Sequence, residues 1–113
     1  MSPVFEVVSG QIRLNRRREF FELHSSVLLP IMLSYDIRPK MLLFTELGRF
    51  SRFLDIYEYD SMADYESKTD QLVADERIGP YYEKVGECVE GGITVELMSN
   101  LPYSSSWVSH DSS

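Results

Sequence analysis

Short runs rich in β-branched and aromatic residues predict four β-strands along the chain. These strands are expected over residues 4–13, 41–47, 52–59 and 93–98. In the first strand Glu6 and Val8 share one face while Phe5 lies on the other, because side chains alternate along a strand. The Ser9-Gly10 pair inside the same strand predicts a bulge or a bend.

Apolar residues at helical spacing predict a first helix that begins after Asn15, a good N-cap residue, and runs to about Ser34. Its apolar stripe contains Phe20 and His24. Pro30 lies inside this pattern, and a proline removes a helical hydrogen bond. We therefore expect a kink or an early break near residues 27–29.

A second helix is predicted between the third and fourth strands. Ser61, or Asp60 before it, can cap the N-terminus, and Asp64 follows Ser61 by three residues as in a capping box. The helix is expected to end near Ala74, and a second helical piece to follow over residues 80–89.

The predicted order of elements is β-α-β-β-α-β, which is the α+β arrangement of a ferredoxin-like domain with an antiparallel sheet. Residues 48–51 read as a tight connection, so the second and third strands should form an antiparallel hairpin. One sheet face would carry the helices, and the other would be bare and apolar. We therefore expect a homodimer that covers these faces. Residues 1–100 are predicted to form the single domain, with an extended or disordered tail over residues 101–113.

Composition narrows the classes of partner. The net charge of −7 argues against a nucleic-acid surface, because phosphate binding needs clustered Lys and Arg. Cys88 is the single cysteine, so no internal disulfide can form. The N-terminal stretch has no signal-peptide pattern, and the most apolar stretch, residues 27–33, is too short to span a bilayer. We expect a soluble cytoplasmic protein with no nucleic-acid or membrane partner.

The third strand has two faces with different chemistry. Alternation places Asp55, Tyr57 and Tyr59 on one face. Leu54 and Ile56 lie on the other face, and we expect the helices to pack there. The interior of the barrel would then carry the polar and aromatic set.

Glu6 joins this interior set by the same alternation, which gives a cavity with two phenols and two carboxylates. A partly buried carboxylate such as Asp55 can act as a general base, and a tyrosine can donate to a developing oxyanion. The alternative is structural. In that case the tyrosines pack at a dimer interface, and the acids pair with Arg13 or Arg52.

His24 is a second candidate for acid–base chemistry, reaching the cavity from the first helix. Alternatively it is a core or boundary histidine that bonds to a carbonyl or a carboxylate. His110 lies in the tail, so a His-rich metal site is not expected, and we predict no cofactor; haem held by His24 is a weaker alternative. Phe44 and Tyr81 are further candidates for ligand contact.

Three stretches carry a family resemblance. LLFTELGRFSRFLDIYEYDSMADYE (residues 42–66), DERIGPYYEKV (75–85) and LPYSS (101–105) resemble the NIPSNAP family. The resemblance covers nearly the whole chain, and it implies a dimeric α/β barrel with the ferredoxin-like topology. The wider superfamily includes cofactor-free monooxygenases, isomerases, haem-binding proteins and assemblies without known chemistry.

The first strand departs from the family pattern. Family members typically have a first strand that reads E-L-R-x-Y, and here the arginine position is Val8 and the tyrosine position is Gly10. A site that depended on that arginine would be missing, or Arg13 or Arg52 would replace it.

These observations give two functional hypotheses. The first is a homodimer that binds or transforms a small apolar or aromatic molecule, ketide-like or phenolic, in a cavity between sheet and helices. Asp55, Tyr57 and His24 would be catalytic, and Glu6 and Tyr59 would contact the ligand, as would Phe44 and Tyr81. The second is a non-catalytic dimerising module whose cavity is filled by side chains.

Overall fold

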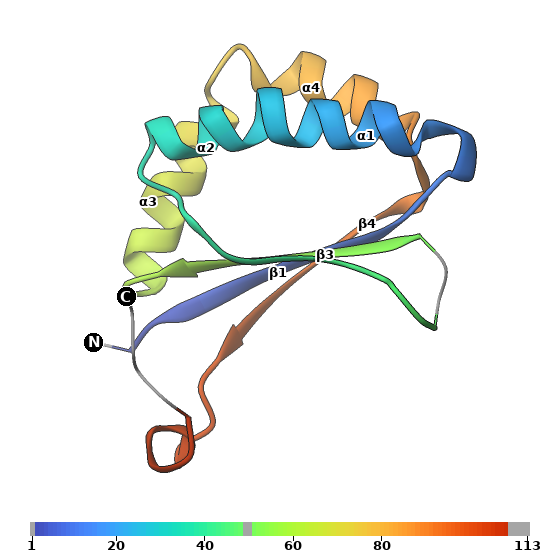
Figure 1. Cartoon of the computed structure of the whole chain (residues 1–113). Helices are drawn as coiled ribbons and strands as arrows, with labels where there is room; N and C mark the ends of the chain where they lie inside the picture. Colours follow the sequence, from blue (N-terminus) through green and yellow to red (C-terminus); the bar gives the residue numbers. More distant parts are fainter. Residues whose placement is uncertain (1, 49–50, 109–113) are drawn as a thin grey trace.

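One antiparallel sheet with helices on a single face makes up the fold (Figure 1). The computed structural model describes residues 2–48 and 51–108. The strands are β1 (Val4–Ile12), β2 (Pro39–Phe44), β3 (Arg52–Tyr59) and β4 (Val89–Ser99). The α-helices are α1 (Arg17–Leu23), α2 (Leu29–Ser34), α3 (Met62–Val73) and α4 (Ile78–Gly86). The strand order is β2-β3-β1-β4, which confirms the predicted ferredoxin-like topology.

The predicted hairpin is present, because β2 and β3 pair antiparallel. β2 begins two residues before the predicted position and ends at Phe44. Part of the connection that we expected to be tight lies at residues 49–50, outside the described residues. In the tail, which we expected to be extended or disordered, Ser104–Ser106 form a short 3-10 helix.

The first helix differs from the prediction at both positions that we singled out. Asn15 is not its cap, because Leu14–Arg16 form a 3-10 turn and α1 begins at Arg17. Pro30 does not break the helix, which continues through a π-helical turn, His24–Leu28, into α2. The wider turn accommodates the missing proline N–H.

The start of α3 agrees with its predicted cap. The Ser61 side chain accepts a hydrogen bond from the Asp64 backbone N–H at 3.1 Å. The Asp64 carboxylate in turn accepts one from the backbone N–H of Asp60 at 2.9 Å. These bonds satisfy N–H groups that a helix start otherwise leaves without partners.

The assignment of the two sheet faces was wrong. The helices cover the face that carries Asp55, Tyr57 and Tyr59, which are 3%, 2% and 1% exposed. Leu54 and Ile56 point to the opposite face and are half-buried. Both faces of the sheet are apolar enough to be buried, so side-chain alternation alone could not decide which one the helices cover.

A bulge interrupts the ladder near the C-terminal end of β1 and the N-terminal end of β4. Gly10 pairs with Ile93 and Gln11 pairs with Glu90, so two residues of β4 bulge out of the ladder. Those two residues are Gly91 and Gly92, and both have positive φ, 76° and 84°. Glycine adopts this conformation without the clash that other residues meet. A bulge or bend was predicted within β1 at Ser9-Gly10; the irregularity instead lies between Gly10 and Gln11, and its extra residues are on β4.

Gly10 itself is required by close packing. A Cβ added there would lie 2.9 Å from Cε1 of buried Phe53 and 3.2 Å from Cγ1 of Val89. We expect Gly10→Ala to lower the free energy of unfolding by about 1–3 kcal/mol, because the core must shift to admit the methyl group. Gly79→Ala is the matched control: a Cβ there meets nothing within 4 Å. Urea unfolding of both variants is the measurement, and equal stabilities would contradict this account of Gly10.

Candidate functional site

A cavity of about 320 Å³ lies between the sheet and the helices. Each of the four α-helices in the described residues contributes a lining side chain. These are Phe20 of α1, Met32 of α2, Leu72 of α3, and Tyr81 and Tyr82 of α4. Its β4 side is the open one, where Val95 is 54% exposed. The lining residues are Glu6, Val8, Phe20, His24, Leu28, Met32, Phe53, Asp55, Tyr57, Leu72, Tyr81, Tyr82, Ile93 and Val95.

Three predicted catalytic residues meet in the wall of this cavity. Nε2 of His24 lies 2.6 Å from Oδ2 of Asp55, and the Tyr57 hydroxyl donates to the same oxygen at 2.9 Å. The His24 and Asp55 side chains are only 12% and 4% exposed. His24 stacks on Phe20, with 5.5 Å between ring centroids, which holds the imidazole in place.

The contact with Asp55 fixes the chemistry of His24. A carboxylate can only accept hydrogen bonds, so Nε2 of the imidazole donates and carries a proton. The other ring nitrogen, Nδ1, is then the basic atom of neutral His24. The pair therefore has the arrangement of a general base oriented by a buried carboxylate.

Tyr57 stays a neutral hydrogen-bond donor in this arrangement. Burial raises the pKa of Tyr57 far above its usual range, and the neighbouring Asp55 raises it further. Its proton therefore remains on the phenol and is committed to Asp55. Tyr57 supports the carboxylate and is not a free donor for a ligand.

Glu6 forms a second polar point of the cavity. Its Oε1 accepts a hydrogen bond from the Tyr59 hydroxyl at 3.1 Å, and its Oε2 accepts one from the Tyr65 hydroxyl at 3.5 Å. Burial raises the pKa of the Glu6 carboxyl, and the two phenols offset part of this rise. Tyr59 is itself buried behind Glu6 and does not line the cavity.

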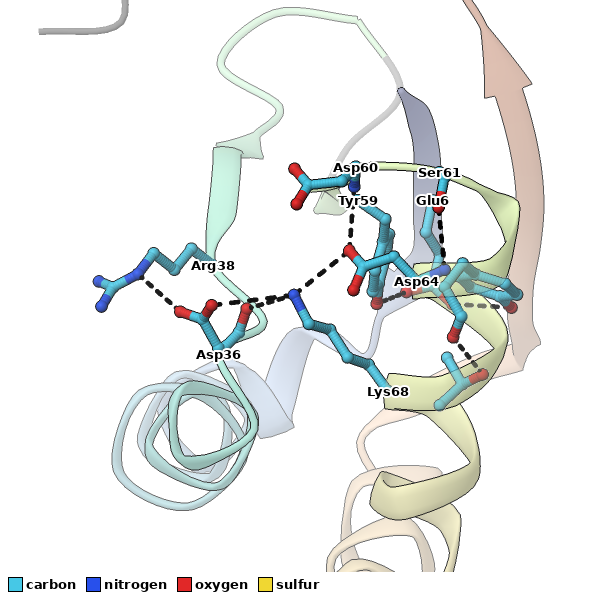
Figure 2. A network of polar contacts seen from close by, with 10 residues as sticks. Glu6, Asp36, Arg38, Tyr59, Asp60, Ser61, Asp64 and Lys68 are labelled. Carbon is cyan, nitrogen blue, oxygen red and sulfur yellow. Dashed lines mark hydrogen bonds and ion pairs between the residues drawn. The ribbon is translucent and has the colours of Figure 1, made fainter. Parts of the chain in front are cut away.

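Glu6 is positioned by the corner where β3 leads into α3, as Figure 2 shows. Lys68 of α3 lies 3.3 Å from Oδ2 of Asp64 and donates to the backbone carbonyl of Asp36 at 3.2 Å. Lys68 therefore ties the turn after α2 to the first turn of α3 (Figure 2). The capped helix start keeps Tyr65 beside Glu6.

Helix α4 brings two phenols to the cavity, Tyr81 and Tyr82. Neither hydroxyl forms a hydrogen bond to another residue within the described part of the chain. Burial raises the pKa of Tyr81 above its usual range, so it is a neutral donor. Tyr81 was predicted to contact a ligand; for the Tyr81-Tyr82 pair, packing over the sheet edge or the cavity mouth was the alternative to lining a pocket.

The remaining sequence candidates lie elsewhere. Phe44 lines a second hollow of about 290 Å³ beside β2, which shares His24 and Asp55 with the main cavity. Arg13 and Arg52 are exposed and do not line the cavity, so neither replaces the family arginine there. Over residues 2–48 and 51–108, no group of three or more His, Cys, Asp or Glu side chains could hold a metal ion.

The family model for NIPSNAP matches residues 5–105 of the sequence. The chain belongs to the NIPSNAP family. The predicted resemblance is therefore confirmed, and the family match extends into the tail beyond residue 100. No curated protein matches the sequence.

Solved structures of NIPSNAP proteins share the fold. A NIPSNAP family protein from Agrobacterium tumefaciens has a TM-score of 0.79 at 17% identity, over 90% of this chain and 96% of that one. An uncharacterised NIPSNAP domain protein from Burkholderia xenovorans has a TM-score of 0.77 at 15% identity, over 88% of this chain and 96% of that one.

The similarity extends to a structure described as a putative antibiotic biosynthesis monooxygenase from Nitrosomonas europaea. Its TM-score is 0.65 at 10% identity, over 89% of this chain and 92% of that one. At these identities the likeness shows the fold alone. Separately, no helix in the described residues is long and apolar enough to cross a membrane.

The raised pKa of Glu6 predicts that the free energy of unfolding of this NIPSNAP chain falls as the pH rises and Glu6 ionises. Its folded pKa lies above the ordinary value of 4.5, so the folded state holds the proton more tightly than the unfolded state. The contribution of Glu6 to the free energy of unfolding is fully present below the unfolded pKa and is lost as the pH rises through the higher folded pKa. Glu6→Gln should therefore gain stability relative to wild type between about pH 4 and about pH 7.

Urea unfolding at both pH values checks this prediction. Glu83→Gln, which removes the same charge from an exposed position on α4, is the control and should track wild type at both. If the difference in free energy of unfolding between Glu6→Gln and wild type is the same at both pH values, burial does not raise the pKa of Glu6 as described.

Proposed function

We propose that this NIPSNAP protein binds a small, flat, mainly apolar molecule in its cavity and removes a proton from it without a cofactor. The observation that carries the proposal is the 2.6 Å contact between His24 and Asp55, buried in the wall of an apolar cavity. A polar pair buried beside open apolar space is typical of a binding or active site.

His24 is the proton acceptor in this proposal. Asp55 receives the Nε2 hydrogen bond and stabilises the imidazolium that forms when Nδ1 takes a proton. Tyr57 holds Asp55 in the orientation that this requires. An axial haem bond through Nε2 would have to replace the contact with Asp55, so the geometry favours acid–base chemistry over haem binding.

Tyr81 is the better candidate for stabilising negative charge on the substrate. The sequence interpretation gave that role to Tyr57 or Tyr59, but both hydroxyls already donate to carboxylates. The Tyr81 hydroxyl has no such partner among the described residues, and Tyr81 lines the cavity. A neutral phenol in an apolar site can donate to an enolate or phenolate oxygen as its charge develops.

The ring opening of nitrobenzisoxazole tests the proposal without knowledge of the natural substrate. The base takes the ring C–H proton, the N–O bond breaks, and the products are a coloured cyanonitrophenolate and a proton on His24. We expect catalysis by wild type and a loss of about a hundredfold in His24→Ala, because a positioned base contributes that order of rate. Absorbance of the phenolate is the measurement.

His110→Ala removes the other histidine of the chain and is the matched control, which should keep wild-type activity. Thermal unfolding shows whether His24→Ala remains folded. Equal rates for folded His24→Ala and wild type, or a wild-type rate no higher than that of imidazole in water, would rule out His24 as the base.

We also propose that the chain forms a homodimer through the sheet face that its helices leave bare (Figure 1). Met41, Leu43 and Met98 lie on this face and are 48%, 46% and 47% exposed. Half-buried Leu54 and Ile56 lie between them. A sheet face with several large exposed apolar side chains favours a self-complementary interface. A non-catalytic dimerising module remains the second candidate function on this observation.

Met41→Lys tests the interface. Met41 is exposed in one chain, so lysine should leave the fold intact, whereas a buried lysine at a dimer interface lacks a partner. We expect sedimentation equilibrium to show wild type as a dimer and a dissociation constant at least about tenfold weaker for the variant. Val73→Lys, at an exposed position on α3, is the control and should dimerise like wild type. A monomeric wild type would exclude the proposed dimer.

A further inference from the structure

The titratable side chains around the cavity have an uneven charge distribution. Two carboxyl groups line it, those of Glu6 and Asp55, together with one imidazole and three phenols. No lysine or arginine is among its described lining residues. The single lining group that can become cationic, His24, is already paired with Asp55.

The two carboxyl groups lie close enough to act on the same ligand. Glu6 is opposite Tyr57 in the β1–β3 ladder, and Asp55 is opposite Val8. Glu6 and Asp55 are therefore diagonal neighbours on one sheet face, with Cα atoms about 7–8 Å apart. In a site of low dielectric, each carboxylate repels a negative ligand more strongly than it would in water.

Glu6 retains capacity to accept a hydrogen bond from a ligand. A carboxylate has about four acceptor positions, and Glu6 uses one for Tyr59 and one for the long contact with Tyr65. Asp55 is 3% exposed, whereas Glu6 is only half-buried. Glu6 is thus the more accessible of the two carboxyl groups that line the cavity.

The aromatic side chains that line the cavity also disfavour anionic ligands. Phe20, Phe53, Tyr57 and Tyr81 line the same cavity as the two carboxyl groups. The face of an aromatic ring is the negative end of its quadrupole, so it attracts cations. A carboxylate ligand would lose its hydration here without gaining a cationic partner, and that loss is costly.

We propose that the cavity selects ligands by charge: it admits uncharged or cationic aromatic molecules that donate a hydrogen bond to Glu6, and it excludes carboxylates. This inference rests on the proposed function, whose ligand it narrows to phenols, aromatic alcohols and aromatic amines. Glu6 is the residue that determines this specificity.

Three probes of matched size test the proposal: para-fluorophenol, para-fluorobenzylamine and para-fluorobenzoate, observed by fluorine NMR near neutral pH. We expect the phenol and the amine to bind wild type and the benzoate to bind at least about tenfold more weakly. Glu6→Gln should weaken binding of the amine by about tenfold, because a charged acceptor is replaced by a neutral one. Glu83→Gln, which changes the net charge equally outside the cavity, should bind all three like wild type.

Val95→Lys is a second test variant, and it changes an exposed residue instead of a buried one. Val95 lines the cavity at its open side, so a lysine there supplies the missing cation and should admit the benzoate. Wild type that binds the benzoate as tightly as the amine would overturn the charge inference and leave ligand binding intact. Wild type that binds none of the probes would overturn both the inference and the binding part of the proposed function.

Discussion

The burial of Asp55 is the constraint on which the arrangement of this molecule depends. A carboxylate that is 3% exposed must be hydrogen-bonded or it becomes too costly to bury. One donor, Tyr57, comes from the same strand, and the other, His24, lies 31 residues away on the helical segment above. The pair therefore holds that helix against one face of the sheet. The cavity exists between those two layers, beside the pair itself.

The contact between His24 and Asp55 also marks the boundary between the features that the sequence could predict and those that it could not. Periodicity identified the strands, the helices and the ferredoxin-like order, because each depends on the local pattern of apolar residues. The face of β3 that the helices cover does not depend on that pattern, because Leu54 and Ile56 make the opposite face equally suitable for burial. What decides the face is a contact between Asp55 and a residue on a distant helix. Spacing along one strand carries no information about such a contact.

In the candidate site, too, the sequence indicated individual residues but not the contacts between residues on different elements. His24 and Asp55 could be singled out as candidates from their types and positions. A hydrogen bond of His24 to a carboxylate was one alternative, but spacing could not identify Asp55 as that carboxylate. The π-helical turn that begins at His24 has a visible signal in Pro30, although the sequence suggested a kink or an early break near residues 27–29 and not a wider turn. Tyr65 gave no sign of its contact with Glu6, because its place on α3 reads as part of a sparse apolar stripe.

The departure of β1 from the family pattern affects both the contact between His24 and Asp55 and the charge of the cavity lining. The resemblance leads one to expect arginine at the position of Val8, and Val8 lies directly opposite Asp55 in the ladder. An arginine there would neutralise Asp55 and bring a fixed positive charge into the cavity. With valine in its place, His24 is the partner of Asp55, and a group that can exchange a proton replaces one that cannot. The same replacement leaves the described lining residues without a lysine or arginine, so the proposed base and the proposed exclusion of anions would have one structural origin.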